Sequence, residues 1–213
     1  MMLRGRFLVL SLVIGVGLMF VGFPQAARAQ TKLKPGQCCP VKVKKSGSYI
    51  LTGNLEPNNP NTDAIEVSAS NVTIDLGGYS IVGPSKTSGS GIGVDALSQT
   101  NVRVENGTVT GMSGSGVAVG SYGIVKNVQS TNNGNGGSGA GIQCTGASCL
   151  VENCVSSANA NGAGLSFIDT TSGYTGNVIQ GNLSTVVGGV SIGNGGISAA
   201  PGSNVCNGSP LCP

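Results

Sequence analysis

Charged side chains recur at one position of a short apolar motif, and they are the first candidates for chemistry. Asp75, Glu105, Lys126 and Glu152 each follow the last apolar residue of a predicted strand, and Arg103 lies beside them. Carboxylates are the ligands that Ca²⁺ prefers, and a lysine or arginine could take a proton. Because the signs of Glu105, Lys126 and Glu152 alternate, the pattern also predicts a surface ladder with Glu105 paired to Lys126 and Lys126 to Glu152.

Other catalytic and metal-binding sets are not indicated by the sequence. The chain has no histidine and no adjacent carboxylates, whereas glycoside hydrolysis uses two carboxyl groups that flank one bond. Cys144, Cys149 and Cys154 are separated by steps of five residues, which do not match the usual zinc-ligand pairs. We therefore predict no resident metal and no cofactor.

A repeat of about 25 residues must position these side chains. The four-residue pattern small, apolar, variable, apolar begins at positions 64, 91, 116, 141, 164 and 189. A second strand with its charged or polar end follows in each unit, and Gln180 continues the series that starts at Asp75. A bend with an asparagine comes next, and then a third short strand. Fixed periods of this length are typical of solenoids.

The repeat predicts an all-β fold, a right-handed parallel β-helix (solenoid) of about six short coils. Regular hairpins, which a sandwich or an antiparallel barrel would need, are not indicated. One apolar ladder is expected to run up the interior through Ile65, Ile92, Val117, Ile142, Leu165 and Val190. Asparagines at the recurring bend are expected to bond to the backbone and to one another, namely Asn106, Asn127, Asn153 and Asn182. Asp75 is expected to cap a turn.

The first residues predict export. Arg4 and Arg6 precede an apolar run that ends in Ala27-Arg28-Ala29, the pattern of a secretory signal peptide cleaved near Ala29. We therefore expect a secreted or periplasmic protein with no membrane span in the mature chain; an uncleaved anchor is the alternative. The mature chain keeps eight basic and eight acidic residues, so its net charge is zero. A neutral chain gives no electrostatic reason to bind nucleic acid.

Four segments are predicted along the chain: a signal peptide at 1–29, an N-terminal lead-in and cap at 30–56, the parallel β-helix at 57–195 and a C-terminal tail at 196–213. Seven cysteines in an exported chain indicate disulfides. Cys206 and Cys212 are the candidates for a bridge that fastens the tail. Cys144 and Cys154 occupy positions held by valines in other repeats and are interpreted as core residues, whereas Cys149 lies outside the repeat frame.

Two stretches resemble a known family. Ser46–Leu55 with Asn71–Ile81 looks like the opening of bacterial right-handed parallel β-helix proteins of the pectate-lyase-like superfold, and Val104–Val109 looks like their repeat unit. The resemblance covers roughly residues 45 to 195 and implies the fold. That fold carries lyases, hydrolases, adhesins and proteins without known activity.

Three hypotheses for function follow. The preferred one is a secreted, non-catalytic β-helix with a surface, glycan-binding or structural role, whose partner would be a polysaccharide or cell-surface glycan. The alternative is a polysaccharide lyase or hydrolase; the resemblance implies that a lyase of this type would hold Ca²⁺ on acids such as Asp75, Glu105 and Glu152 and use Lys126 or Arg103 as base. The third is a shortened relative of a larger enzyme, since few coils and short bends leave little to wall a substrate groove.

Overall fold

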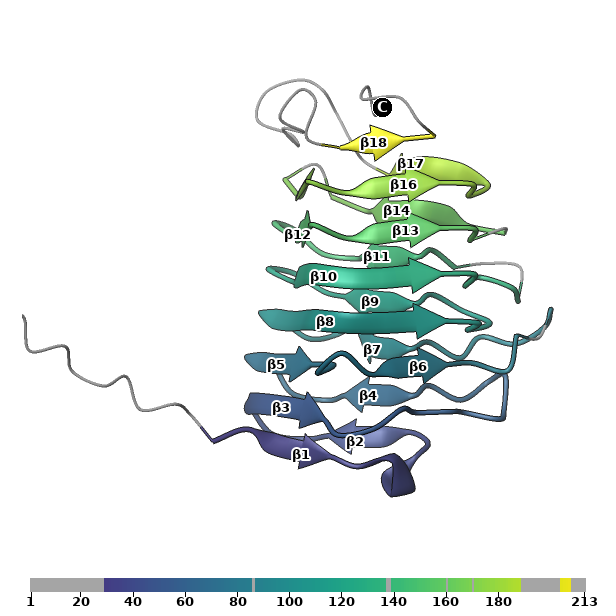
Figure 1. Cartoon of the computed structure of the whole chain (residues 1–213). Coiled ribbons are helices and arrows are strands. Elements are labelled where there is room, and N and C mark those ends of the chain that lie inside the picture. The colour runs from purple at the N-terminus through teal and green to yellow at the C-terminus, as the bar shows by residue number, and fades with distance from the viewer. Residues whose placement is uncertain are drawn as a thin grey trace, which may run out of the picture.

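The computed structural model describes residues 29–85, 87–136, 139–159, 161–169, 171–188 and 204–207. These residues form a parallel β-solenoid of about six turns, which confirms the predicted all-β fold class. The chain winds from β1 at one end of the stack to β18 at the other, with one sheet in front of the second (Figure 1). The predicted signal peptide, apart from Ala29, lies outside the described residues.

The larger sheet has eleven strands and contains two of the three strands of a typical coil. In β8 and β10 these two strands are continuous, and in other coils a bend separates them. The strands are β1 (Thr31–Leu33), β3 (Gly47–Leu51), β5 (Val72–Asp75), β6 (Ser80–Val82), β8 (Val102–Thr110), β10 (Ile124–Thr131), β12 (Leu150–Glu152), β13 (Val155–Ser157), β15 (Gly173–Thr175), β16 (Val178–Gln180) and β18 (Val205–Cys206).

The second sheet consists of seven strands. It lies behind the larger sheet in Figure 1 and closes the other side of the core. Its strands are β2 (Val41–Val43), β4 (Ile65–Val67), β7 (Val94–Ala96), β9 (Val117–Val119), β11 (Ile142–Cys144), β14 (Ala163–Phe167) and β17 (Ser184–Gly188). A short 3₁₀ turn, η1 (Pro35–Gln37), precedes β2.

The apolar ladder of the second sheet differs from the predicted one at two steps. Val94, rather than Ile92, pairs with both Ile65 and Val117, and the ladder continues through Ile142 and Leu165. Leu165 then pairs with Val186, whereas Val190 lies outside the described residues. The prediction of Ile92 was wrong because Gly91-Ile92-Gly93-Val94 contains the small–apolar pattern twice, and only the second copy forms the strand.

The core is filled by inward side chains that stack from one coil to the next. Ile74, Val104, Val125, Val151 and Tyr174 form one such column in the larger sheet, and all five are buried. Burying an aliphatic side chain of this size stabilises a fold by about 1.5–3 kcal/mol. Successive short strands therefore hold together through a continuous column rather than through contacts within one coil.

A buried polar stack replaces part of this apolar filling. Asn159 Oδ1 accepts the backbone N–H of Asn133 at 2.9 Å, and Asn182 Oδ1 accepts that of Asn159 at 2.9 Å. The prediction that Asn182 continues the column of Asn106, Asn127 and Asn153 was therefore wrong. In register, Gly176 follows Asn153, because Glu152 pairs with Thr175. Asn182 instead lies 23 residues after Asn159 and stacks on it at the following bend of the coil.

The N-terminal segment carries strands of both sheets. β2 pairs with β4 in the second sheet, and β3 pairs with β5 in the larger one. β1 lies on β3 and is the outermost strand at this end, so paired strands begin before residue 57. At the other end β18 pairs with β16, while most of the predicted tail at 196–213 lies outside the described residues.

Candidate functional site

The charged column predicted from the sequence is in register over four strands. Asp75 pairs with Glu105, Glu105 with Lys126, and Lys126 with Glu152, from β5 through β12. The next member is Thr175, not Gln180, which pairs with Ser157 on the neighbouring strand. The four side chains thus occupy equivalent positions in successive coils.

Their ion pairs are only partly those predicted. Lys126 Nζ lies 3.1 Å from Glu152 Oε2, as expected. Glu105 Oε2 instead lies 3.2 Å from Arg103 Nη1, two residues earlier on the same strand and hence on the same side of the sheet. Arg103 is therefore the charge partner of Glu105. The sequence had predicted Lys126 in this role. Each basic group of the column is paired with one acid.

Asp75 has the structural role expected for it. Its Oδ1 accepts the backbone N–H of Gly77 at 2.9 Å, the bond that defines an Asx turn, and the amide of Asn106 at 3.2 Å. Within the part of the chain that the structure describes, no three His, Cys, Asp or Glu residues are grouped so that they could hold a metal ion. The acids of the column do not converge.

Asparagines bend the larger sheet beside this column. Asn106, Asn127 and Asn153 have φ of 60°, 52° and 53°, the left-handed conformation that asparagine tolerates better than most residues. Asn127 Nδ2 donates to Asn106 Oδ1 at 3.2 Å, so the side chains bond along the stack. The bend separates the charged strand from the third strand of each coil.

A shallow groove of about 420 Å³ runs along this bend over successive coils, and we call it the amide groove. Its lining crosses three strands: Gln129 pairs in register with the polar Thr108 on one side and with the apolar Val155 on the other. Both Asn127 and Gln129 are exposed to solvent. The residues that line it include Gly107, Thr108, Asn127, Gln129, Asn153 and Val155.

An exposed tyrosine adjoins the amide groove in the chain. Tyr79 directly follows Gly78, which lines the groove, and its carbonyl accepts the backbone N–H of Thr108 at 3.2 Å. The side chain of Tyr79 is 40% exposed. Tyr79, Thr108 and Gln129 were not among the site residues predicted from the sequence. These residues could have been found in the sequence by comparing the outward-facing positions of the third strand in successive repeats.

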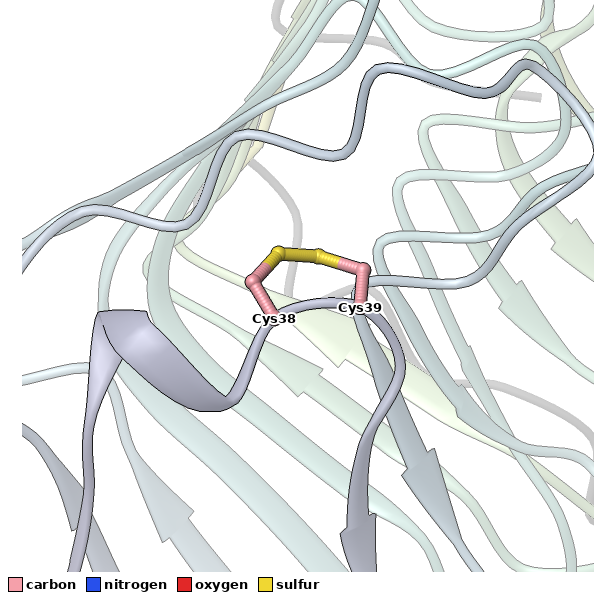
Figure 2. The surroundings of a disulfide bond; sticks show 2 residues. All are labelled: Cys38 and Cys39. Atoms are coloured by element: carbon pink, nitrogen blue, oxygen red, sulfur yellow. A yellow bond between two sulfur atoms is a disulfide. The ribbon is translucent and has the colours of Figure 1, made fainter.

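A second depression, of about 330 Å³, lies at the N-terminal end of the solenoid. Cys38 and Cys39 form a disulfide between neighbouring residues at its edge, between η1 and β2 (Figure 2). Glu56, Asn58 and Asn59 also line it. The sequence analysis assigned no partner to these two cysteines.

The remaining cysteines are divided between the interior and the C-terminal end. Cys144, Cys149 and Cys154 are buried free thiols. Cys144 stacks on Val119 of the coil before. Cys154 occupies the position equivalent to Val128 of the coil before, as the sequence indicated. Cys206 is buried and disulfide-bonded, but Cys212 lies outside the described residues, so the Cys206–Cys212 bridge stays a prediction.

Comparisons with known proteins add no relative. No family model, no curated protein and no solved structure matches this chain. Among the described residues, no helix has the length and apolar character needed to cross a lipid bilayer.

Proposed function

We propose that the protein is a secreted, non-catalytic β-helix that binds a polysaccharide or cell-surface glycan in the amide groove. The observation that carries the proposal is the groove that Thr108, Asn127 and Gln129 line on two neighbouring coils, with the exposed Tyr79 directly after its lining residue Gly78. Repeated polar groups along a groove suit a repeating ligand, because each coil can meet the next part of the same chain.

The chemistry of the groove suits an uncharged sugar chain. Amides and hydroxyls both donate and accept hydrogen bonds, as sugar hydroxyls do. A tyrosine ring presents an apolar face with a polar tip, on which the C–H face of a sugar ring can stack. Successive strands lie about 4.8 Å apart, close to the length of one sugar unit in an extended polysaccharide. A flat, open groove also leaves both ends of such a chain free.

Geometry argues against catalysis at the charged column. Rungs two coils apart are about 10 Å apart, which is too far for Glu105 and Glu152 to share one cation directly. Lys126 and Arg103 each lie within 3.2 Å of a carboxylate oxygen, so neither stands free to take a proton. The neutral net charge of the mature chain gives no field to gather an acidic polysaccharide.

Secretion of the chain and its membership of a protein superfold are parts of the same proposal. The predicted signal peptide at 1–29 would place the mature chain in the periplasm or outside the cell, where glycans are exposed. The repeat and the resemblance over residues 45–195 support membership of the pectate-lyase-like superfold of bacterial β-helix proteins. On this proposal the chain keeps the scaffold of that superfold and uses it for binding.

A glycan array probed with the purified mature protein tests the proposal. Retention of neutral polysaccharides, with no change in their chain length after incubation, is the expected result. Incubation of pectate and alginate with added Ca²⁺ should yield no unsaturated products. Unsaturated products that disappear in Lys126→Ala would overturn the proposal in favour of a lyase.

A further inference from the structure

Two free thiols meet inside one bend of the solenoid. Cys144 is the last residue of β11, Cys149 precedes β12, and the four residues between them turn the chain from the second sheet into the larger one. Both side chains are buried, and a hydrogen bond joins the two thiols. Cys149 Sγ also lies 3.1 Å from the carbonyl oxygen of Gly120 in the coil before.

The preceding coil gives an independent measure of how close these positions are. Cys144 stacks on Val119, and Cys149 stacks on Gly123, because Leu150 pairs with Ile124. A Cβ placed on Gly123 would lie only 2.7 Å from the Cβ of Val119. The two ladders therefore approach one another at this bend. In the lower coil they come closer than the distance of about 3.5–4.5 Å between Cβ atoms that a disulfide requires, and the upper bend is one residue longer.

The length of the bend explains why Gly123 in one coil is replaced by Cys149 at the equivalent position of the next coil. In the lower coil three residues separate Val119 from Gly123, and no side chain fits beside the valine. In the next coil four residues separate Cys144 from Cys149, and both positions carry a side chain. The longer bend makes room for two sulfur atoms in contact.

We propose that Cys144 and Cys149 are a modification site, at which an intrachain disulfide forms by exchange with a small-molecule disulfide once this bend has formed and before the next coil covers it. The thiolate of Cys149 attacks one sulfur of the oxidant, forms a mixed disulfide and releases one thiolate. Cys144 then loses its proton and attacks Cys149 Sγ, which releases the second thiolate. One oxidant disulfide is reduced, and one protein disulfide is formed.

The electrostatics of the pair favour this order. The hydrogen bond from Cys144 lowers the pKa of Cys149 to about 7, so a large fraction of Cys149 is thiolate at neutral pH. The hydrogen bond with Cys149, followed by burial, raises the pKa of Cys144 well above its usual value. Cys149 is therefore the attacking group, and Cys144 becomes reactive once its neighbour is consumed.

Cys154 lies apart from Cys149. Four residues separate the two cysteines, the three extended residues of β12, which span about 10 Å, and Asn153. Its Sγ lies instead near the carbonyl oxygen of Glu152, at 3.3 Å. Burial raises the pKa of its thiol to about 11, so it stays protonated at neutral pH.

Peptide mapping of the full-length chain tests the proposal. The chain is unfolded with reductant, refolded in oxidised and reduced glutathione, treated with an alkylating reagent under denaturing conditions and cut after glutamate. The fragment 106–152 contains Cys144 and Cys149 and no other cysteine. It should be lighter by two hydrogen atoms and carry no alkyl group, and after added reductant it should carry two.

Matched variants complete the test. Cys154→Ser should leave the mapping of 106–152 unchanged, whereas Cys144→Ser should leave Cys149 open to alkylation. The proposal is overturned if the unreduced wild-type fragment carries two alkyl groups, or if it is linked to the fragment that contains Cys154. Should a serine variant fail to fold, the wild-type comparison of the two redox states still decides.

Discussion

Lys126 Nζ lies 3.1 Å from Glu152 Oε2 in the next coil, and the two residues are partners in the strand register. Both side chains are about one-third exposed, so water screens the pair. Since Glu105 pairs with Arg103 rather than with Lys126, the column consists of separate pairs and not of one continuous ladder. This arrangement is that of a stabilised surface and not of a converging site.

Lys126→Ala should therefore cost little. We expect a loss of less than about 1 kcal/mol in the free energy of unfolding, measured by chemical denaturation, because exposed ion pairs contribute at most that much. Glycan binding should be unchanged. A loss above about 3 kcal/mol would show that Glu152 is left as an unpaired buried charge and would contradict this account of the column.

Asn159→Ala should cost much more. The substitution removes the acceptor of the buried backbone N–H of Asn133, together with the bond from Asn159 Nδ2 to Ser156 Oγ at 3.1 Å. Leaving buried polar groups unpaired predicts a loss of about 2–4 kcal/mol in the free energy of unfolding. Asn161→Ala is the matched control: Asn161 is exposed, and its loss should cost less than about 0.5 kcal/mol. Equal effects of the two variants would refute the stack as a stabilising element.

Asp63 and Glu66 should give stability opposite dependences on pH. Burial raises the pKa of Asp63 above 3.8, although its Oδ1 accepts the N–H of Ile92 at 2.8 Å. The folded chain then binds this proton more tightly than the unfolded chain, so charged Asp63 is a cost at neutral pH that disappears as the pH falls towards 3.8. Asp63→Asn keeps the acceptor and should raise the denaturation midpoint at pH 7 but not at pH 3.8.

Glu66→Gln is the control with the reverse sign. The hydrogen bond from Lys42 lowers the pKa of Glu66 below 4.5, so its contribution is present above that pH and is lost as the pH falls through the folded-state pKa. The denaturation midpoint of Glu66→Gln should be lower than that of the wild type at pH 7, and the difference should vanish in acid. The same sign of change in both variants at pH 7 would contradict these assignments.

Much of the fold could be predicted from the sequence, because each coil repeats its apolar residues and its bend asparagine. The register could not be fixed where the pattern is ambiguous: Ile92 and Val94 both follow a glycine, and the true partner of Ile65 lies 29 positions further along the chain. The partner of Glu105 depends on side-chain conformation, since Arg103 and Lys126 are both within reach of it. The amide groove was missed because Thr108 and Gln129 come from different coils, and only the stacking of the coils brings them together.

The most direct test of glycan binding compares two exposed tyrosines. Tyr79 directly follows Gly78, which lines the amide groove, and is 40% exposed, whereas neither Tyr122 nor its neighbours in the chain line the groove, and Tyr122 is 61% exposed. Tyr122 has a φ of 57°, so its ring is best removed by Tyr122→Asn, while Tyr79→Ala serves for the groove. With the polysaccharide retained on the array, titration should show a dissociation constant raised roughly tenfold by Tyr79→Ala. Tyr122→Asn should leave the constant within about twofold of the wild type. Equal binding by Tyr79→Ala and the wild type, or no glycan retained by the wild type, would contradict the account.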